Sequence, residues 1–393
     1  MKYDFDTILD RQHTNSEKWD VKPGELPMTT ADMDFKTAPE IMQAMKDKIN
    51  AGAFGYEYPS QEYFDAVAHW YKIEHNAEAQ TSWMRFATGV IPSITASVNH
   101  LSHTGDNVLL MEPVYNTFYN SILNSGRHAL ASQLKYDRST YTYSVDWDDL
   151  EEKMSNPLTT LMILCNPHNP TGYVWSRDEL MRIIKLAQKY GVIVISDEIH
   201  GDLVLKGPDY TPTFSLPEEY RQNLVTLVST SKTFNVAALH AATGIVANPI
   251  LREHFTRAIN KYEVAEPNLL AIPGTIAAYT QGADWLHQLK KYLLDNREYL
   301  EQFISDNLPQ LHVVPGTATY LVWIDVSEVT KDSNALAQKI RQETGLIINP
   351  GTYYHGNGNE FIRINIAYPL AQIKDGLTRL AKAIKNYLLE LAL

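Results

Sequence analysis

The sequence has little cysteine, no excess of basic residues and no long apolar run. Cys165 is the single cysteine among 393 residues, so no intramolecular disulfide can form, and a reducing compartment fits this composition. The formal net charge of −12 argues against a nucleic-acid surface or a binder of anionic membranes. No segment approaches the roughly 18 consecutive apolar residues of a membrane helix, and the charged N-terminus lacks the apolar core of a signal peptide. We therefore expect a cytoplasmic protein with neither a nucleic-acid nor a membrane partner.

The G-x-G-x-x-G signature of a nicotinamide-binding βαβ unit is also missing, which argues against a dehydrogenase. The middle of the chain instead alternates regularly between strand and helix patterns. Residues 159–165, 192–196 and 224–230 are apolar and β-branched without polar alternation, as in strands buried on both faces. A capping-box pair, Ser176 and Glu179, opens the helix predicted between the first two of these strands. This pattern predicts an α/β fold, in which helices cover a mostly parallel sheet.

The two ends of the chain predict a second, smaller unit. Residues 1–35 form an irregular arm, and a helix is expected from Pro39, capped by Thr37. A long helix over 285–307 is expected to bridge to a smaller α+β domain. The other elements of that domain are strands 318–325, 346–348 and 361–366 and helices 334–344 and 369–391. The predicted domains are 51–284 for the large one, and 1–50 together with 285–393 for the small one.

Three polar side chains follow successive predicted strands. Asn169 lies in an Asn-Pro-Thr-Gly turn, Asp197 ends the next strand, and Lys232 follows the third strand after three small hydroxyl residues. Ligands in open α/β sheets bind at the carboxyl edge of the strands. Pyridoxal 5'-phosphate needs an amine for a Schiff base, a carboxylate for its ring nitrogen and a donor for its ring oxygen. Taken alone, Lys232 could be a solvated surface lysine, Asp197 a helix cap and Asn169 part of a simple turn. The combination of the three predicts this cofactor.

A phosphate needs N–H donors and small side chains around it. Gly89, Val90 and Ile91 lie at a predicted strand-to-helix junction, where backbone N–H groups and the helix N-terminus favour an anion. Ser229 and Ser231 could add hydroxyl groups. The alternative for the first three residues is an ordinary glycine turn.

Three further side chains are candidates for contacts with the cofactor or the substrate. Tyr115 either stacks on the cofactor ring or is a plain core aromatic. His200 could orient Asp197 or contact the ring oxygen, and a purely structural histidine is an equal alternative. Arg363 lies between two isoleucines on a short strand, where it is either a bidentate clamp for an α-carboxylate or a surface-facing arginine. We expect no metal site.

Together these motifs resemble the fold-type I pyridoxal-phosphate enzymes of the class I and II aminotransferase superfamily. More narrowly, they resemble the MalY/PatB family of cystathionine β-lyases, which are C–S lyases. The matching segments are Ala31-Asp-Met-Asp-Phe35, Phe54-Gly-Tyr56, Gly89-Val-Ile-Pro92, Pro113-Val-Tyr115, Cys165-Asn-Pro-His-Asn-Pro-Thr-Gly172, Ser196-Asp-Glu-Ile-His200, Ser231-Lys-Thr-Phe-Asn235, Thr319-Tyr-Leu-Val-Trp323 and Arg363-Ile-Asn365. The resemblance implies a three-layer, aspartate aminotransferase-like large domain with a mostly parallel sheet, plus a smaller α+β domain.

The resemblance also implies a role for each matched residue. Lys232 would hold the cofactor and act in catalysis, and Asp197 would pair with the ring nitrogen. Asn169 would bond the ring oxygen. Arg363 would bind the substrate carboxylate.

Other implied roles concern the substrate pocket and a partner subunit. Tyr56 would reach the cofactor phosphate of the partner in a homodimer, and Asp32 and Tyr320 would contact the substrate. Thr29 and Thr30 depart from the family pattern, which usually has a tryptophan and an aliphatic residue there. Because these positions flank the substrate pocket, they bear on substrate preference.

The implied reaction is α,β-elimination from a sulfur amino acid such as cystathionine or cysteine. Its products would be a thiol (homocysteine or sulfide), pyruvate and ammonia. An aminotransferase that passes the amino group of an L-amino acid to a 2-oxo acid would use the same residues and is the first alternative. A cofactor-binding regulatory protein on this scaffold is the second, against which the intact Lys232, Asp197 and Arg363 argue.

Overall fold

The apolar runs in the middle of the chain assemble into a seven-stranded sheet in the computed structural model, which describes residues 2–391. The strand order is β2-β10-β9-β8-β7-β3-β4, and all neighbours are parallel except where β10 pairs with β2 and β9. In chain order the strands are β2 (Met84–Ala87), β3 (Asn107–Glu112), β4 (His128–Gln133), β7 (Thr159–Cys165), β8 (Ile193–Asp197), β9 (Leu224–Val228) and β10 (Ala242–Ile245). The mostly parallel sheet expected from the sequence is confirmed.

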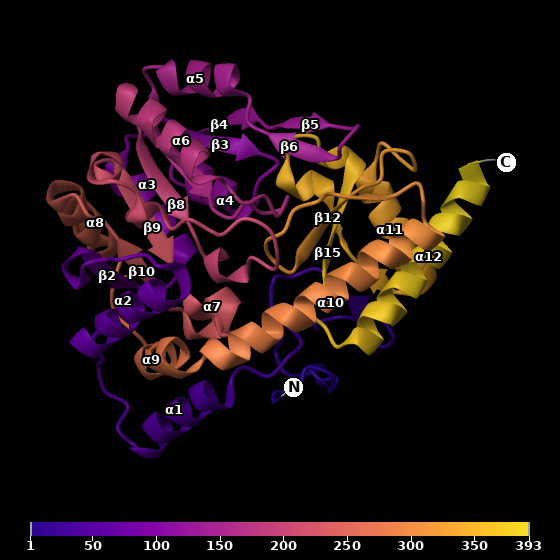
Figure 1. The fold of residues 1–393 in the computed structure, drawn as a ribbon, viewed down its shortest axis with the longest axis horizontal. Helices are drawn as coiled ribbons and strands as arrows, with labels where there is room; N and C mark the ends of the chain where they lie inside the picture. Colours follow the sequence, from indigo (N-terminus) through magenta and orange to yellow (C-terminus); the bar gives the residue numbers. More distant parts are fainter. Residues whose placement is uncertain (1, 392–393) are drawn as a thin grey trace.

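Helices cover both faces of this sheet (Figure 1). The helices of this lobe, in chain order, are α1 (Pro39–Asn50), α2 (Gln61–His75), α3 (Val90–Leu101), α4 (Thr117–Leu123), α5 (Trp147–Ser155), α6 (Arg177–Lys189), α7 (Thr230–Thr233), α8 (Pro249–Lys261) and α9 (Ala271–Gln281), of which α1 packs against α9. On β7, Leu161 and Ile163 belong to the core shared with α3 and α8, whereas Met162 and Leu164 belong to the core shared with α5 and α6. Alternate side chains of one strand are thus buried on opposite faces, which explains the unbroken apolar sequence.

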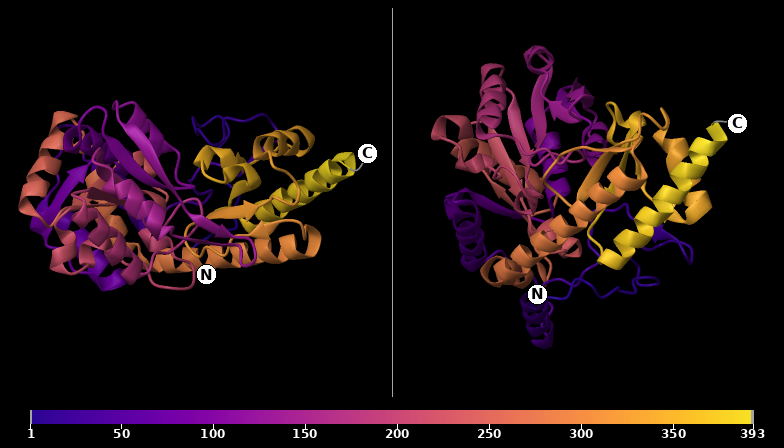
Figure 2. Two further views of the ribbon diagram at one scale, coloured as in Figure 1. Left: turned by 90° about the horizontal axis from the view of Figure 1, so that it is seen from above. Right: turned by 45° about the vertical axis from the view of Figure 1, so that its right-hand side comes forward.

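A second sheet builds the smaller lobe. Its four antiparallel strands have the order β11 (His312–Val313), β12 (Leu321–Asp325), β15 (Phe361–Asn365) and β14 (Asn349–Pro350). Helices α11 (Ser333–Thr344) and α12 (Leu370–Leu391) lie beside this sheet, and α10 (Ala283–Asn307) runs from the large lobe to the small one (Figures 1 and 2). This is the smaller α+β unit expected from the sequence.

The remaining elements are short. Two small sheets pair β1 (Leu26–Pro27) with β13 (Leu346–Ile347) and β5 (Lys135–Asp137) with β6 (Thr142–Ser144). Single 3-10 turns lie at Thr81–Trp83, Gly201–Leu203, Thr213–Ser215, Glu218–Arg221, Ala237–Leu239, Gly351–Tyr354 and Gly358–Glu360. Among residues 2–391, no helix combines the length and the apolar character of a membrane span.

Two local expectations are wrong. Thr37 does not cap α1, because its hydroxyl donates to the carbonyl of Phe234, and the proline at the start of the helix needs no such cap. The predicted strand 224–230 stops at Val228, and the next residue, Ser229, instead caps α7 by accepting the N–H of Ser231. Lys232 therefore lies in a one-turn helix beyond the strand end.

Candidate active site

The carboxyl ends of β7, β8 and β9 open into a cavity of ≈ 270 Å³. Most of the candidate residues line it: Gly89, Val90, Ile91, Tyr115, Asn169, Asp197, His200, Ser231 and Lys232. Parallel strands place their carboxyl ends at one edge, so local sequence patterns far apart in the chain converge here. A larger hollow of ≈ 580 Å³ beside α10 shows no such convergence of polar groups from strand ends.

Lys232 presents a partly buried amine to this cavity. Its Nζ donates to the carbonyl of Ala31 at 2.6 Å. Burial disfavours the charged form and lowers the pKa of the amine to about 8, although Asp32 and Asp197 pull in the opposite direction. An amine with such a pKa is neutral for a larger share of the time than a surface lysine, as a nucleophile or a base requires.

Asp197 brings a carboxylate that forms no ion pair with any residue between 2 and 391. It is 4 % exposed at the end of β8, and its Oδ1 accepts the backbone N–H of Ile199 at 3.1 Å. Burial raises the pKa of this carboxyl to about 7, against the lowering effects of that hydrogen bond and of Lys232. A cation bound against Asp197 would favour the ionised form and offset its desolvation.

Asn169 and His200 lie beside these two groups. The Oδ1 of Asn169 accepts a hydrogen bond from Arg363 Nη1 at 3.1 Å, which leaves the amide Nδ2 to donate elsewhere. Burial, reinforced by Lys232 and Arg363, lowers the pKa of His200 to about 3, so its ring is neutral. Its buried Nδ1 has no partner within the part of the chain that the structure describes.

The first turn of α3 supplies the N–H groups expected at the phosphate end. Gly89 precedes the helix with φ 137°, a backbone angle that favours glycine, and a Cβ there would crowd Pro92 Cδ at 3.2 Å. The backbone N–H groups of Val90 and Ile91, at the start of α3, have no acceptor within the helix and can bind an anion. Ser229 differs from the expectation, because it donates to Ala241 O at 2.7 Å and braces Ser231 instead of lining the cavity.

Arg363 is buried and is not the surface-facing arginine of the alternative interpretation. It is 3 % exposed on β15, and its Nη2 donates to the carbonyl of Thr29 at 3.1 Å. The ring of Tyr354 lies 4.7 Å from the guanidinium carbon. The buried Nε has no partner among the described residues, so one edge of the guanidinium keeps an unused donor. The sequence did not indicate Tyr354, because no local pattern links it to Arg363.

Five candidates lie outside the cavity lining: Ser229 and Arg363, described above, and Asp32, Tyr320 and Tyr56. The carboxylate of Asp32 pairs with Arg11 at 2.8 Å and Lys18 at 3.1 Å instead of facing the cavity. Tyr320 is fully buried, and its hydroxyl donates to Ala31 O at 3.0 Å. Tyr56 is 100 % exposed and makes no contribution to the cavity of its own chain.

The cavity suits pyridoxal 5'-phosphate. A protonated ring nitrogen would supply the cation that Asp197 lacks, and the unpartnered His200 Nδ1 and the Asn169 amide offer polar contacts to the ring. The start of α3 offers donors to the phosphate, and Lys232 offers the amine. Within residues 2–391, no group of three or more histidine, cysteine or acidic side chains is arranged to hold a metal ion.

The raised pKa of Asp197 predicts how stability varies with pH. Its folded pKa of about 7 exceeds the reference value of 3.8, so its contribution to stability is complete below pH 4 and is lost as pH rises through 7. In cofactor-free protein, Asp197→Asn should therefore gain on the order of 3 kcal/mol in unfolding free energy relative to wild type between pH 4 and pH 8. Denaturant titrations across this range measure the difference, with the exposed Asp295→Asn as baseline. Parallel curves for wild type and Asp197→Asn would contradict the burial argument.

Comparison with known proteins agrees with this geometry. The family model described as aminotransferase class I and II matches residues 24–380. Cystathionine β-lyase PatB of Bacillus subtilis (strain 168) is 37% identical over 97% of this chain and 99% of its own length, and protein MalY of Escherichia coli (strain K12) is 33% identical over 98% and 99%. The structure of a pyridoxal-phosphate-bound C–S lyase from Staphylococcus hominis superposes with a TM-score of 0.91 at 31% identity, covering 98% of this chain and 99% of that one. The chain therefore belongs to the class I and II aminotransferase family, in the branch that contains PatB and MalY.

Proposed function

We propose that this chain is a pyridoxal 5'-phosphate-dependent C–S β-lyase that converts cystathionine- or cysteine-type amino acids into a thiol, pyruvate and ammonia. The observation that carries the proposal is that Lys232, whose amine has a lowered pKa, and Asp197, whose carboxyl has a raised pKa, line one cavity. The chain is also related over 97% of its length to a cystathionine β-lyase. When bound there, the cofactor supplies a sink for the electron pair left on the substrate Cα. The chain itself must hold the cofactor, orient the substrate and move the proton.

Lys232 is the proton carrier in this proposal. Its pKa of about 8, set by burial, lets the Nζ take the proton from the substrate Cα near neutral pH. Asp197, ionised beside a cation, holds the ring nitrogen in its protonated form. After the Cα proton is lost, a double bond forms between Cα and Cβ while the bond between Cβ and sulfur breaks, and the thiolate leaves. Water then hydrolyses the released 2-aminoacrylate to pyruvate and ammonia.

Arg363 and Asn169 connect substrate binding to cofactor binding. Arg363 holds the α-carboxylate through its unused Nε–H and a second N–H of Nη2. Asn169 holds the opposite side of the same guanidinium at 3.1 Å and turns its amide nitrogen towards the cofactor ring oxygen. The hydrogen-bonded pair of Arg363 and Asn169 thus positions the substrate carboxylate relative to the cofactor ring.

We place the protein in a homodimer, with Tyr56 reaching the cofactor phosphate of the partner subunit. The loop between α1 and α2 exposes three aromatic side chains, Phe54 at 70 %, Tyr56 at 100 % and Tyr58 at 76 %. A cluster of this kind is typical of a surface that is buried against another molecule. Helix α1 extends away from the body of the large lobe, as the right-hand view of Figure 2 shows, which suits an embrace between two copies. A cytoplasmic location is part of the proposal and is supported by the single, buried free cysteine.

The reaction type is tested by product analysis with L-cystathionine as the only substrate. We expect pyruvate and homocysteine to appear without any added 2-oxo acid. Lys232→Ala should lower the rate at least about 100-fold, because it removes the proton carrier. A strict requirement for a 2-oxo acid acceptor would instead identify an aminotransferase, and substantial elimination by Lys232→Ala would contradict the proposed role of the lysine.

The carboxylate clamp is tested by Arg363→Lys. A lysine keeps the charge but loses the two-pronged donor edge, so we expect KM for cystathionine to rise about 10- to 100-fold with a smaller change in kcat. Arg257→Lys, at an exposed pair with Glu253, is the matched control. An unchanged KM in Arg363→Lys would count against the clamp.

The shared site is tested by mixing two inactive variants. Tyr56→Ala and Lys232→Ala each spoil every site in their own dimers, but a mixed dimer rebuilds one intact site from one chain of each kind. After subunit exchange in equal amounts, roughly a quarter of wild-type activity should return. Mixed dimers that form, as verified by differently tagged subunits, yet remain inactive would exclude Tyr56 from the partner's site.

A further inference from the structure

A short segment of the N-terminal arm lies against the substrate side of the cavity with its carbonyl groups in use. We call residues 29–32 the strap. Thr29 O accepts from Arg363 Nη2 at 3.1 Å, and Ala31 O accepts from Lys232 Nζ at 2.6 Å. Thr30 O and Asp32 O both accept from the side-chain amide of Asn365, at 2.7 and 2.8 Å. Two residues of β15, Arg363 and Asn365, therefore hold the strap by hydrogen bonds to its carbonyl groups.

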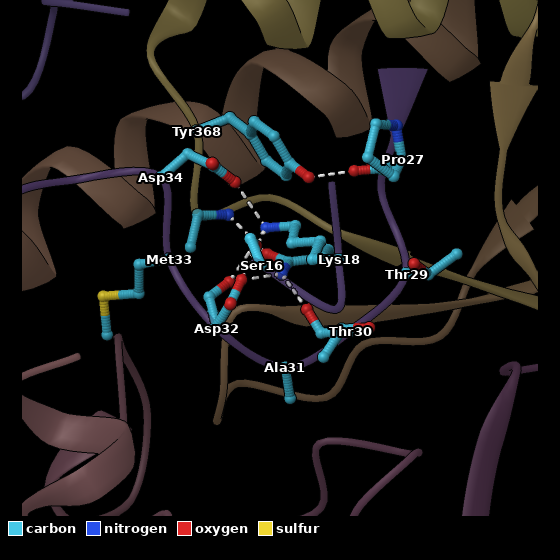
Figure 3. Close-up of polar contacts among 12 residues, drawn as sticks. Ser16, Lys18, Pro27, Thr29, Thr30, Ala31, Asp32, Met33, Asp34 and Tyr368 are labelled. Carbon is cyan, nitrogen blue, oxygen red and sulfur yellow. Dashed lines mark hydrogen bonds and ion pairs between the residues drawn. The ribbon is translucent and has the colours of Figure 1, made fainter. Parts of the chain in front are cut away.

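Next to the strap lies a partly buried ion network, which we call the anchor and define as Arg11, Lys18, Asp32 and Asp34. Figure 3 shows Lys18, Asp32 and Asp34. The side chains of Lys18 and Asp34 are 0% and 1% exposed and contact each other directly. Lys18 Nζ also lies 3.1 Å from Asp32 Oδ1, while Arg11 reaches Asp32 at 2.8 Å and Asp34 at 3.1 Å. In Figure 3, Lys18 extends between the carboxylates of Asp32 and Asp34.

Two aromatic residues complete the enclosure of the anchor. The indole N–H of Trp19 donates to Asp34 Oδ1 at 2.6 Å. The ring of Tyr368 lies 4.0 Å from Lys18 Nζ, and its hydroxyl donates to the carbonyl of Pro27, just before the strap. Buried ion pairs of this kind contribute little net stability, because desolvation of the charges offsets their attraction. In some proteins such pairs instead specify one arrangement of the groups they hold, and we infer that role here.

The orientation of the Arg363 guanidinium is set by three neighbours, one of which is the strap. Asn169 accepts from Nη1, Thr29 accepts from Nη2, and Tyr354 lies against the flat face. Nη2 carries two N–H groups, so one of them remains available to donate, as does the unpartnered Nε–H. A displaced Thr29 carbonyl would let the guanidinium turn and would disperse the two donors that a carboxylate must meet together.

We propose that the anchor is a positioning device for the substrate: through the strap it orients Arg363 towards the α-carboxylate. The proposal rests on the carboxylate-binding role of Arg363 proposed above. Arg11, Lys18 and Asp34 touch neither substrate nor cofactor, so they are positioning residues. Their removal should change carboxylate affinity more than the proton transfer at Lys232, whose amine contacts the strap only through Ala31 O.

The test measures carboxylate affinity in the cofactor-loaded enzyme with two kinds of variant. Lys18→Met removes the central cation of the anchor, and the double variant Thr29→Gly/Thr30→Gly keeps every strap carbonyl but loosens the backbone. Lys2→Met is the matched control, because Lys2 belongs to the same arm but forms only an exposed pair with Asp284 at 3.4 Å. We measure KM and kcat with cystathionine and the inhibition constant of propionate, a carboxylate that has no amino group. The absorbance of the bound cofactor is recorded for each variant.

We expect both test variants to raise KM and the propionate inhibition constant together, by about 10-fold or more, with kcat within about threefold of wild type and unchanged absorbance. Lys2→Met should match wild type. A lower melting temperature with both affinities unchanged would overturn the proposal, because the anchor would then only fasten the arm. A collapse of kcat or loss of the absorbance would also overturn it.

Two provisions keep the outcome decisive. If Lys18→Met fails to fold because Asp34 loses its partner, the glycine double variant alone decides. Arg363→Lys is measured in parallel: if it raises both constants and the anchor variants do not, the anchor proposal fails while the clamp stands. If Arg363→Lys leaves both constants unchanged, the clamp itself fails.

Discussion

The chemistry of this protein depends on the removal of water from one lysine and one aspartate at the carboxyl edge of a parallel sheet. Strand β8 ends in Asp197, and the turn after β9 carries Lys232. Burial raises the pKa of the aspartate to about 7 and lowers that of the lysine to about 8, so neither charge is well compensated by the protein alone. A cofactor with a cationic ring nitrogen can pair with Asp197, and its aldehyde can react with the Lys232 amine. The burial of these two groups therefore favours both cofactor binding and reactivity.

The central strands could be predicted from the sequence because each is a short apolar run bounded by turn residues. Strand β10 could not, since its four residues include Gly244, where a Cβ would lie 2.3 Å from the ring of Phe255. Packing against α8, and not local preference, makes that segment a strand. Helix α9 was missed for a similar reason, because Gly274 follows a proline near its start and is accommodated only by close packing against Leu239.

The functional site likewise contains residues that could be predicted from the sequence and contacts that could not. Lys232, Asp197 and Asn169 could be identified because each directly follows a recognisable strand. The contacts that orient Arg363 could not, since one is the backbone carbonyl of Thr29, more than 300 residues earlier in the chain, and a carbonyl has no sequence signature. The domain limits 51–284 and the second subunit remain predictions.

Substrate recognition, in this account, is built where the arm and the small lobe meet, and the electron chemistry is built on the large lobe. Arg363 on β15 and Asn169 after β7 join the two through one hydrogen bond of 3.1 Å. Such a division lets substrate preference change through residues of the arm, such as Thr29 and Thr30, while the lysine and aspartate stay in place.

The covalent attachment of the cofactor tests this account most directly. The purified protein is reduced with borohydride, digested, and analysed by peptide mass. We expect the pyridoxyl group on the peptide that contains Lys232. Its recovery on another lysine, or its absence from every peptide of a protein loaded with the cofactor, would contradict the account.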